Sequence, residues 1–570
     1  MKKLLKTKYG ILLVMMIPLG LSLITACKKN ENKITPNIVL GISDTLYVPN
    51  LGGTKSIVFV SNIAWEASSD VDWISIANTS GGKGKDTLQF TVDANNGDER
   101  TGKIMISSMS GDFTKEIKVV QASGISRNFF VKEGKSGEGH SWADATSLQK
   151  ALEQAVDGDT IFVAAGTYYP SKIITNGDPG DEGDKTFEIS KNITIIGGYP
   201  ADATLGASAD PSTNKTILSG DLGGGNTAYH VVAVSAPKVN GLKVTLVGLT
   251  ITEGNASNKS TKFDLNGTTF YRNDGGGMII GNANVEINNC EIINNHSQYS
   301  NAGIFINGGA EVIIRNSKVN KNIASGGNGA GIWVYGSSIL KVYNCEISEN
   351  IAKGGVAGAV YVYMGSKLFL YNTTVAHNEC TSYGAAVYLR DKSEGVLINC
   401  LIYDNSSTSP NGGGGLMMYD NCDATIISST ITKNNIAGPG GGVYRRSGDN
   451  KLSIYNSIIS GNTQKDNGRD VDVYETSESQ PVIKASVIGS KVYDINGLLL
   501  TNTTFDVNNM LNAQFIPIGT DNPALTKGMS AEALSGVGAD IYPPLDEDYI
   551  KSDMKGTSRS GATVMGALLP

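Results

Sequence analysis

The chain has 570 residues, of which 69 are glycine and 18% are charged. A length of this order accommodates several domains or one long solenoid, and the low charged fraction argues against broad disorder. The formal net charge of −7 excludes the basic surface that a nucleic-acid partner requires. With four histidines the chain cannot supply a histidine-rich metal site, so we predict no metal and no cofactor.

Residues 1–27 are predicted to be a targeting segment. A basic start precedes an apolar run from Ile11 to Leu23, a pattern that is typical of a secretory signal and too short for a membrane span. The run ends in Ile24-Thr25-Ala26-Cys27, which resembles the bacterial lipobox. The resemblance implies cleavage before Cys27 and lipidation of this residue. The alternative is ordinary secretion with an unmodified cysteine.

Lipidation of Cys27 implies an outer-membrane lipoprotein, since several acyl chains hold a protein at a membrane durably. The polar residues 28–37 suit a short tether. They contain one acidic residue, Glu31, whereas surface-export signals of the Bacteroidetes usually carry more acid after the lipidated cysteine. The sequence therefore leaves open which face of the outer membrane carries the protein.

Residues 38–124 are predicted to form a separate all-β domain. Short alternating strand patterns are divided by turn clusters, which indicates an immunoglobulin-like sandwich. Four segments, Trp65–Asp70, Asp72–Ile76, Arg100–Ile104 and Val119–Ala122, occur in an order that resembles the BACON domain of Bacteroidetes surface and secreted proteins. That family was proposed to bind carbohydrate or mucin, and some members act as spacers. The resemblance therefore implies location more firmly than binding.

After this domain the pattern changes to one amphipathic helix. Leu148, Ala151, Leu152, Ala155 and Val156 fall at i, i+3, i+4, i+7 and i+8, which is one apolar helical stripe. Such a helix can close the exposed hydrophobic end of a solenoid, so we predict an N-terminal cap. The strand patterns at 160–164, 193–198 and 216–220 resemble the opening coils of right-handed parallel β-helices of the pectate-lyase-like superfold.

The stretch from Gly275 to Asn462 repeats one unit about seven times. The steps are 27 to 29 residues, which predicts a β-rich solenoid. A second asparagine keeps the same step, and we predict that these side chains form inward hydrogen-bonded ladders. The copies begin at Asn289, Asn316, Asn344, Asn372, Asn399, Ser428 and Asn456, and the second asparagines are Asn295, Asn322, Asn350, Asn378, Asn405, Asn434 and Asn462.

The predicted fold is therefore all-β: an immunoglobulin-like β-sandwich followed by a right-handed parallel β-helix with an N-terminal helix cap. The β-helix is placed at 128–500 and its C-terminal cap at 501–570. Cys290, Cys345 and Cys400 occupy one position on alternate coils, about 9–10 Å apart. A disulfide needs Cα atoms within about 7 Å. We therefore predict that these cysteines are free, buried thiols.

Two outward-facing columns of residues are unusually aromatic. Stacked at one strand spacing per coil, they would form a strip roughly 24 Å long. Flat rings beside hydroxyl and guanidinium groups suit sugars, whose faces are apolar and whose rims form hydrogen bonds. The alternative is that the rings stack on each other or lie under a loop such as 256–272. One column is Phe305, Trp333, Tyr361, Tyr388, Met417 and Tyr444, and its neighbour is Asn307, Tyr335, Tyr363, Arg390, Tyr419 and Arg446.

A few charged residues could carry catalysis or bind a cation. Asp391 and Asp420 lie one coil apart beside Arg390 and Arg446, and paired carboxylates next to a cation could act as general acid and base on a glycan. The loop 175–185 holds four acidic residues that could bind calcium. Their spacing defines no ligand set, and an acidic solvated loop is the favoured interpretation.

We therefore predict a cell-envelope lipoprotein that binds a polysaccharide or glycoconjugate through an exposed aromatic strip. One alternative is a polysaccharide lyase or glycoside hydrolase that uses Asp391, Asp420 and the nearby arginines. Another is a structural or adhesive surface protein that binds a protein. The sequence fixes neither the glycan nor the oligomeric state.

Overall fold

The computed structural model describes 471 of the 570 residues, in several segments. The predicted signal peptide 1–27 with Cys27, and the predicted tether up to residue 35, lie outside the described residues. The described residues are 36–40, 45–48, 52–95, 97, 100–121, 127–239, 241–256, 261–464, 472–477, 479–500, 510–518, 522–530, 533–534, 549, 552–555, 557–559 and 564–569.

The N-terminal domain consists of two facing sheets. Its alternating strands turn Phe59, Trp65 and Phe90 inward, where each is at most 1% exposed, and the rings of Phe59 and Trp65 meet edge to face at 5.0 Å. This arrangement agrees with the predicted sandwich. One sheet has the order β1 (Ile38–Leu40), β3 (Gly53–Ser61), β7 (Gly84–Val92), β5 (Ile74–Ile76); the other has the order β2 (Thr45–Val48), β9 (Thr114–Gln121), β8 (Arg100–Ser108), β4 (Trp65–Ser69), β6 (Ser80–Gly81).

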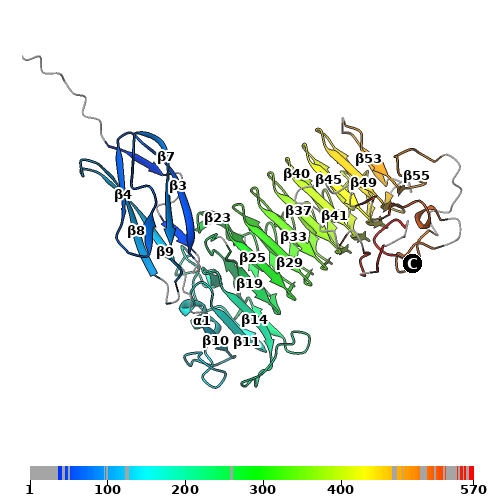
Figure 1. Ribbon diagram of the computed structural model, residues 1–570. Helices are drawn as coiled ribbons and strands as arrows, with labels where there is room; N and C mark the ends of the chain where they lie inside the picture. The colour runs from blue at the N-terminus through cyan, green and yellow to red at the C-terminus, as the bar shows by residue number, and fades with distance from the viewer. Residues whose placement is uncertain are drawn as a thin grey trace, which may run out of the picture.

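The rest of the chain winds into a right-handed parallel solenoid, in which each coil contributes one strand to each of several sheets (Figure 1). In the order of the coil we name them sheets I to IV. Sheet I contains β10 (Asn128–Val131), β11 (Thr160–Ala164), β14 (Thr194–Tyr199), β19 (Val244–Val247), β25 (Asn284–Asn288), β29 (Glu311–Arg315), β33 (Ile339–Tyr343), β37 (Lys367–Tyr371), β41 (Glu394–Ile398), β45 (Asp423–Ile427), β49 (Lys451–Tyr455) and β53 (Val482–Lys484).

Sheet II is equally long, and sheet III is short. Sheet II contains β12 (Gly166–Tyr168), β15 (Thr216–Ser219), β20 (Leu249–Thr252), β26 (Glu291–Ile293), β30 (Lys318–Asn320), β34 (Glu346–Ser348), β38 (Thr374–Ala376), β42 (Leu401–Tyr403), β46 (Thr430–Thr432), β50 (Ile458–Ile459), β54 (Ser486–Ile488) and the antiparallel β55 (Lys491–Tyr493). Sheet III contains β21 (Asn255–Ala256), β27 (His296–Ser297), β31 (Ile323–Ala324), β35 (Ile351–Ala352), β39 (Glu379–Cys380), β43 (Ser406–Ser407), β47 (Asn435–Ile436) and β51 (Thr463–Gln464).

Sheet IV carries both aromatic columns. Its strands are β13 (Phe187–Ile189), β18 (Val232–Val234), β24 (Met278–Gly281), β28 (Ile304–Asn307), β32 (Ile332–Val334), β36 (Val360–Val362), β40 (Val387–Arg390), β44 (Leu416–Tyr419), β48 (Val443–Arg446) and β52 (Val473–Glu475). Two hairpins project from the coils: β16 (Asp221–Gly223) with β17 (Asn226–Thr227), and β22 (Lys262–Leu265) with β23 (Thr268–Tyr271).

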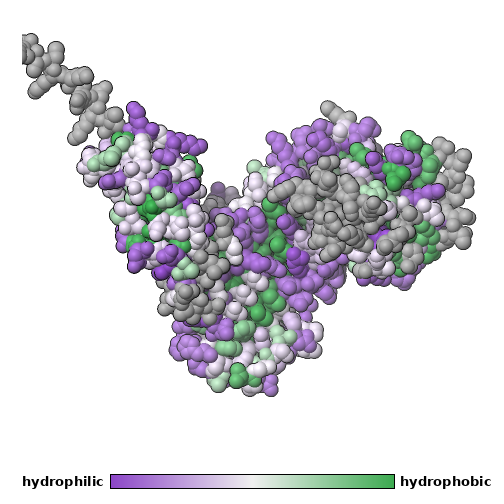
Figure 2. All heavy atoms as spheres, in the orientation of Figure 1, coloured by the Kyte–Doolittle hydropathy of each residue, from purple (hydrophilic) through white to green (hydrophobic). Residues whose placement is uncertain are grey.

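The core is a column of apolar side chains that runs through the whole solenoid. In sheet IV, for example, Ile332 and Val334 are fully buried and stack on the equivalent residues of the neighbouring coils. On the face drawn in Figure 2, by contrast, hydrophobic residues appear in scattered groups among hydrophilic ones. Strand alternation therefore divides inward from outward residues as the sequence predicts.

The predicted asparagine ladder is confirmed. Asn378 donates through Nδ2 to Asn405 Oδ1 at 2.9 Å, and Asn405 donates in the same way to Asn434. The same contact links every pair from Asn295 to Asn462, and all of these asparagines are buried. Each amide also donates to a backbone carbonyl at the bend, such as Ile402 O for Asn434. The ladder thus satisfies buried polar groups where the chain turns.

The five cysteines among the described residues are free and buried, as predicted for Cys290, Cys345 and Cys400. Burial raises the pKa of each of these three thiols to about 12. They therefore stay protonated at neutral pH and pack as small apolar groups.

The N-terminal end of the solenoid is closed by the predicted helix. Helix α1 (Leu148–Gln154) buries Leu148, Ala151 and Leu152 against the first coils, and Ser147 caps it by accepting a hydrogen bond from Lys150 N. Segment 137–146 pairs with the free edge of β10 through Phe130 and Thr146. Both the open end and the first strand edge are therefore covered.

The described parts of 501–570 lie against the side of the last coils as well as their end. The one-turn 3₁₀ helix η3 (Pro523–Leu525) packs, together with Met510 and Met565, against Val487 near the end of sheet II. Met529 and Leu534 pack with Tyr371 and Ile398 on the outer face of sheet I. This segment therefore covers strand faces that the sequence alone presents as exposed.

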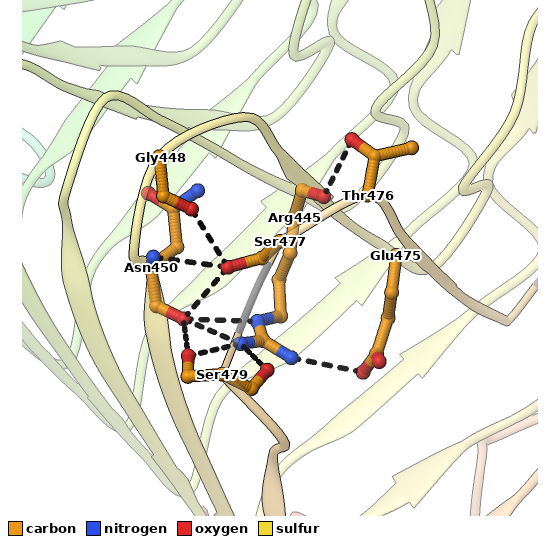
Figure 3. A network of polar contacts seen from close by, with 7 residues as sticks. All are labelled: Arg445, Gly448, Asn450, Glu475, Thr476, Ser477 and Ser479. Carbon is orange, nitrogen blue, oxygen red and sulfur yellow. Dashed lines mark hydrogen bonds and ion pairs between the residues drawn. The ribbon is translucent and has the colours of Figure 1, made fainter.

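An arginine points into the core near the C-terminal end. Arg445 on β48 follows Met418 in an otherwise apolar inward column and is fully buried. Its guanidinium pairs with Glu475 Oε1 at 3.0 Å and donates to Ser479 Oγ at 2.8 Å and to the carbonyl of Asn450 (Figure 3). The strand pattern Val443-Tyr444-Arg445-Arg446 contains two adjacent arginines, and the sequence does not predict the partners of Arg445. The inward apolar column of sheet IV therefore ends in the ion pair of Arg445 and Glu475, whose polar groups have hydrogen-bond partners.

We expect Asn434→Ala to lower the free energy of unfolding by about 3 kcal/mol, because buried donors and acceptors on both adjacent coils lose their partners. Asn435→Ala is the matched control, since Asn435 is the next residue and its side chain is exposed. We expect that control to change stability by about 0.5 kcal/mol or less. Urea denaturation followed by circular dichroism measures both, and equal losses would contradict the ladder's contribution.

Candidate functional site

The two aromatic columns lie on the outer face of sheet IV in the predicted register. In the first column, Phe305 pairs with Trp333, Trp333 with Tyr361, and Tyr361 with Tyr388. Met417 and Tyr444 continue this column on β44 and β48. In the second column, Arg390 pairs with Tyr419 and Tyr419 with Arg446. Parallel pairing without a slip is what brings residues some 28 positions apart into one line.

The rings of the first column stack on one another. The centroids of Phe305 and Trp333 are 4.8 Å apart, those of Trp333 and Tyr361 are 5.6 Å apart, and those of Tyr361 and Tyr388 are 5.1 Å apart. The planes differ by 28° at most. One strand spacing matches the distance at which offset rings attract each other, so the sheet itself sets up the stack.

Because of this stacking, the prediction of an exposed strip is wrong for the first column except at Trp333, which is half-buried. Phe305, Tyr361, Tyr388 and Tyr444 are at most 6% exposed. Each ring covers the next, and turn residues including Tyr383 pack over their sides. Alternation tells which residues leave the core, but it does not tell how far neighbouring side chains cover them. Burial also raises the pKa of Tyr361 and Tyr388, which keeps both phenols neutral.

The second column forms the accessible surface. Its residues from Tyr335 onward are half-buried, and from Tyr363 onward they alternate between phenol and guanidinium groups. Arg390 lies 5.2 Å from the ring centroid of Tyr363 and 5.5 Å from that of Tyr419. Arg446 lies 5.5 Å from Tyr419 on its other side and 4.7 Å from Tyr383. Flat groups held over one another in this way present edges and donors to the solvent.

The strip, which we define as the outward residues of sheet IV from Trp333 to Tyr474, is longer at its far end than predicted. Tyr474 on β52 pairs with Tyr444, its ring lies 5.3 Å from that of Tyr444, and it is 41% exposed. The repeat does not predict this residue, because residues 463–472 break the regular step between β48 and β52. The pattern Val473-Tyr474-Glu475 repeats the strand of the earlier coils and could have revealed it.

A hairpin covers the other end of the columns. Phe263, Leu265 and Phe270 of β22 and β23 pack on Ile279 and Phe305, and the rings of Phe270 and Phe305 meet edge to face at 5.7 Å. Phe305 therefore belongs to a small core and not to the accessible surface. The alternative that a loop within 256–272 covers part of the columns is correct for this end.

The candidate catalytic residues lie together at the edge of the strip. Asp391 and Asp420 each follow a strand of sheet IV, in left-handed turns with φ of 54° and 65°. Arg390 Nε is 4.0 Å from Asp420 Oδ2, with both side chains about two-fifths exposed. The Nε atom has no hydrogen-bond partner, so this ion pair is loose. Arg446 lies on the neighbouring side of Tyr419.

The acidic loop 175–185 is organised by contacts within the protein. Asp184 is fully buried and pairs with Arg272 through two hydrogen bonds of 2.7 and 2.6 Å. Asp181 accepts a hydrogen bond from Tyr229. Within the part of the chain that the structure describes, no group of three or more His, Cys, Asp or Glu side chains is placed to hold a metal ion. The same residues include no helix that is long and apolar enough to cross a membrane.

Two protein families match this chain. The family described as right handed beta helix region matches residues 239–357, 297–459 and 358–520, and the N-terminal binding domain BACON matches residues 64–122. The chain is a BACON domain followed by a right-handed β-helix. The two families together indicate a carbohydrate-related function. No curated protein matches the chain.

Several solved structures resemble parts of it at low identity. Pectate lyase Pel9A aligns with 70% of this chain and 86% of its own, at 13% identity and a TM-score of 0.40. The Bacteroides ovatus GH5 xyloglucanase in complex with a XXXG heptasaccharide aligns with 29% of this chain at 17% identity and a TM-score of 0.15, and this chain spans 37% of the xyloglucanase's own length. WR4, an MSP family member of C. elegans, aligns with 15% of this chain and 96% of its own, at 18% identity and a TM-score of 0.12.

The two columns should respond differently to truncation. We expect Tyr388→Ala to lower the free energy of unfolding by about 3–4 kcal/mol, because it removes a buried ring from the stack. Tyr419→Ala should cost about 1 kcal/mol or less, since that ring is half-buried. Thermal denaturation of the two variants measures the difference. Similar losses in both would show that the second column is also part of the core.

Proposed function

We propose that this protein binds a polysaccharide or glycoconjugate along the strip, with the glycan lying over the second column. The observation that carries the proposal is the alternation of Tyr363, Arg390, Tyr419 and Arg446, whose planar groups are half-buried and held in place by a rigid sheet. Ring faces and edges suit the apolar faces of sugars, and guanidinium groups can donate hydrogen bonds to hydroxyl or acidic groups. The β-helix and BACON matches support the same class of ligand.

The dimensions of the strip suit an extended chain of several sugars. From Trp333 on β32 to Tyr474 on β52 there are five strand steps, or roughly 24 Å. The buried first column fixes the height and orientation of the second, so little side-chain entropy is lost on binding. A preorganised surface of this kind can bind without a deep cavity.

The location of the protein is part of the proposal. Lipidation at Cys27 would place the BACON domain and the β-helix outside the cytoplasm, on one face of the outer membrane. Labelling with a radioactive fatty acid tests the anchor: Cys27→Ala should abolish incorporation and release the protein from the membrane fraction. Incorporation that persists in this variant would contradict lipidation at Cys27.

A polysaccharide lyase or glycoside hydrolase is the second candidate. It is favoured by one observation, the proximity of Asp420 to Arg390 beside the strip, where a bound sugar would meet a carboxylate and a cation. Incubation with a panel of polysaccharides should release no product if binding is the only function. Product release that Asp391→Asn or Asp420→Asn abolishes would establish the enzyme instead.

Binding is tested on a glycan array and by titration calorimetry with the full mature chain. We expect Tyr363→Ala and Tyr419→Ala each to weaken binding about tenfold, which corresponds to about 1.4 kcal/mol. Tyr169→Ala is the matched control, because Tyr169 is 52% exposed and lies far from the strip in the first coils. Unchanged affinity in both strip variants, or binding to a protein and to no glycan, would refute the proposal.

A further inference from the structure

The hairpin β22–β23 ends the accessible surface abruptly. It lies over the outer face of β18, β24 and β28, where Ala233, Ile279 and Phe305 are buried beneath Phe263, Leu265 and Phe270. Trp333 on the next strand, β32, and Tyr335 directly after it are only partly buried and form the edge of this small core. The change from covered to accessible therefore takes place within one strand spacing.

The residues under the hairpin leave space for its side chains. A Cβ atom at Gly281 would lie 2.8 Å from a ring carbon of Phe270 and 3.0 Å from Cβ of Thr268. One at Gly308 would lie 2.3 Å from Thr268 Oγ1. Gly281 occupies the second column, in register with Asn307. A glycine thus stands where the later coils have tyrosine or arginine, and the space is used by the hairpin.

The hairpin is anchored from several sides. Arg272, directly after β23, forms the buried ion pair with Asp184, and both side chains are at most 7% exposed. Asn176 donates to the carbonyl of Asp264 at 3.1 Å, and Asn307 donates to that of Thr269 at 3.4 Å. A buried bidentate pair of this kind holds its geometry well. The hairpin is therefore a fixed part of the surface beside the strip.

A layer packed face to face on a sheet stands about 10 Å above it. A glycan that lies on Trp333 and Tyr335 and runs along the strip therefore meets the hairpin end-on. We propose that the strip receives the end of a glycan chain, with the terminal sugar against the hairpin, and does not bind internal segments of a long chain. This inference rests on the proposed glycan binding and adds the mode of recognition.

Tyr271 and Tyr335 are the residues placed to contact that terminal sugar. Tyr271 is the half-buried last residue of β23, with Lys262 Nζ 5.1 Å from its ring centroid. Tyr335 packs against the apolar cluster beneath the hairpin, and its ring centroid lies 6.3 Å from that of Phe305. Burial raises the pKa of Tyr335, with smaller contributions from Tyr363 and Tyr271. Two hydroxyl groups and an amine at a closed end can recognise the additional hydroxyl that only a chain terminus offers.

The number of proteins bound per glycan chain tests the inference. The full mature chain is titrated by calorimetry with short and long fractions of linear polygalacturonate, of linear xylan, and of the glycan that binds best on the array. For end recognition, the number of proteins bound per chain stays constant as the chain becomes longer. A number that rises in proportion to chain length overturns the inference and leaves glycan binding intact. Absence of binding to all of these glycans overturns both the inference of end recognition and the proposed glycan binding.

Two variants locate the recognition at the hairpin. Tyr271→Ala should weaken binding of a short oligosaccharide about tenfold without changing the number bound per chain. Replacement of residues 262–271 by a short Gly-Ser linker should make that number rise with chain length, because internal segments could then pass over β28. Lys451→Ala, an exposed cation on sheet I, is the control. If Tyr271→Ala has no effect on short oligosaccharides, the terminal sugar does not lie at the hairpin.

Discussion

The parallel register between successive coils is the constraint on which the rest of this structure depends. Backbone pairing fixes the strand spacing, and the asparagine ladder from Asn295 to Asn462 fixes the bend between sheets II and III in every coil. A slip by one residue would turn the apolar column of the core outward. The same slip would bury the planar groups of the second column. Fold and surface are therefore specified by one set of contacts.

The strip shows how a scaffold can hold planar side chains in place without a cavity. The first column resembles a second core on the outside of sheet IV, in which Tyr361 and Tyr388 are covered by their neighbours. This outer core supports the second column from below and fixes the positions of its side chains. The consequence is that truncations in the first column should act on binding through stability, and those in the second column directly.

The sequence predicts the features that depend on periodicity and fails for those that interrupt it. The solenoid, the ladder, the free cysteines and the cap at Leu148–Gln154 all follow from repeated spacing or from one helical stripe. The hairpin at 262–271 lies in an insertion, and Tyr474 follows another, so the repeat places neither. Alternation with the outward Tyr444 and Arg446 makes Arg445 an inward residue, but the repeat does not predict its partners Glu475 and Ser479. The hairpin covers Phe305 through tertiary contacts, which the residue pattern of a single strand does not predict.

The asparagine ladder also has a direction. Each amide donates to the oxygen of the next coil, and the last one, Asn462, donates to Asp472 Oδ1 at 2.6 Å. A carboxylate accepts hydrogen bonds and has no proton to donate, so Asp472 terminates the series.

Between the first and last members, an extra unit of about 28 residues could be duplicated without disturbing its neighbours, because each coil offers the same donor and the same acceptor. Each duplication would lengthen the strip by one strand spacing, while the hairpin and Asp472 would keep its two ends unchanged. Proteins of this architecture could therefore adjust the length of ligand they accommodate through copy number alone.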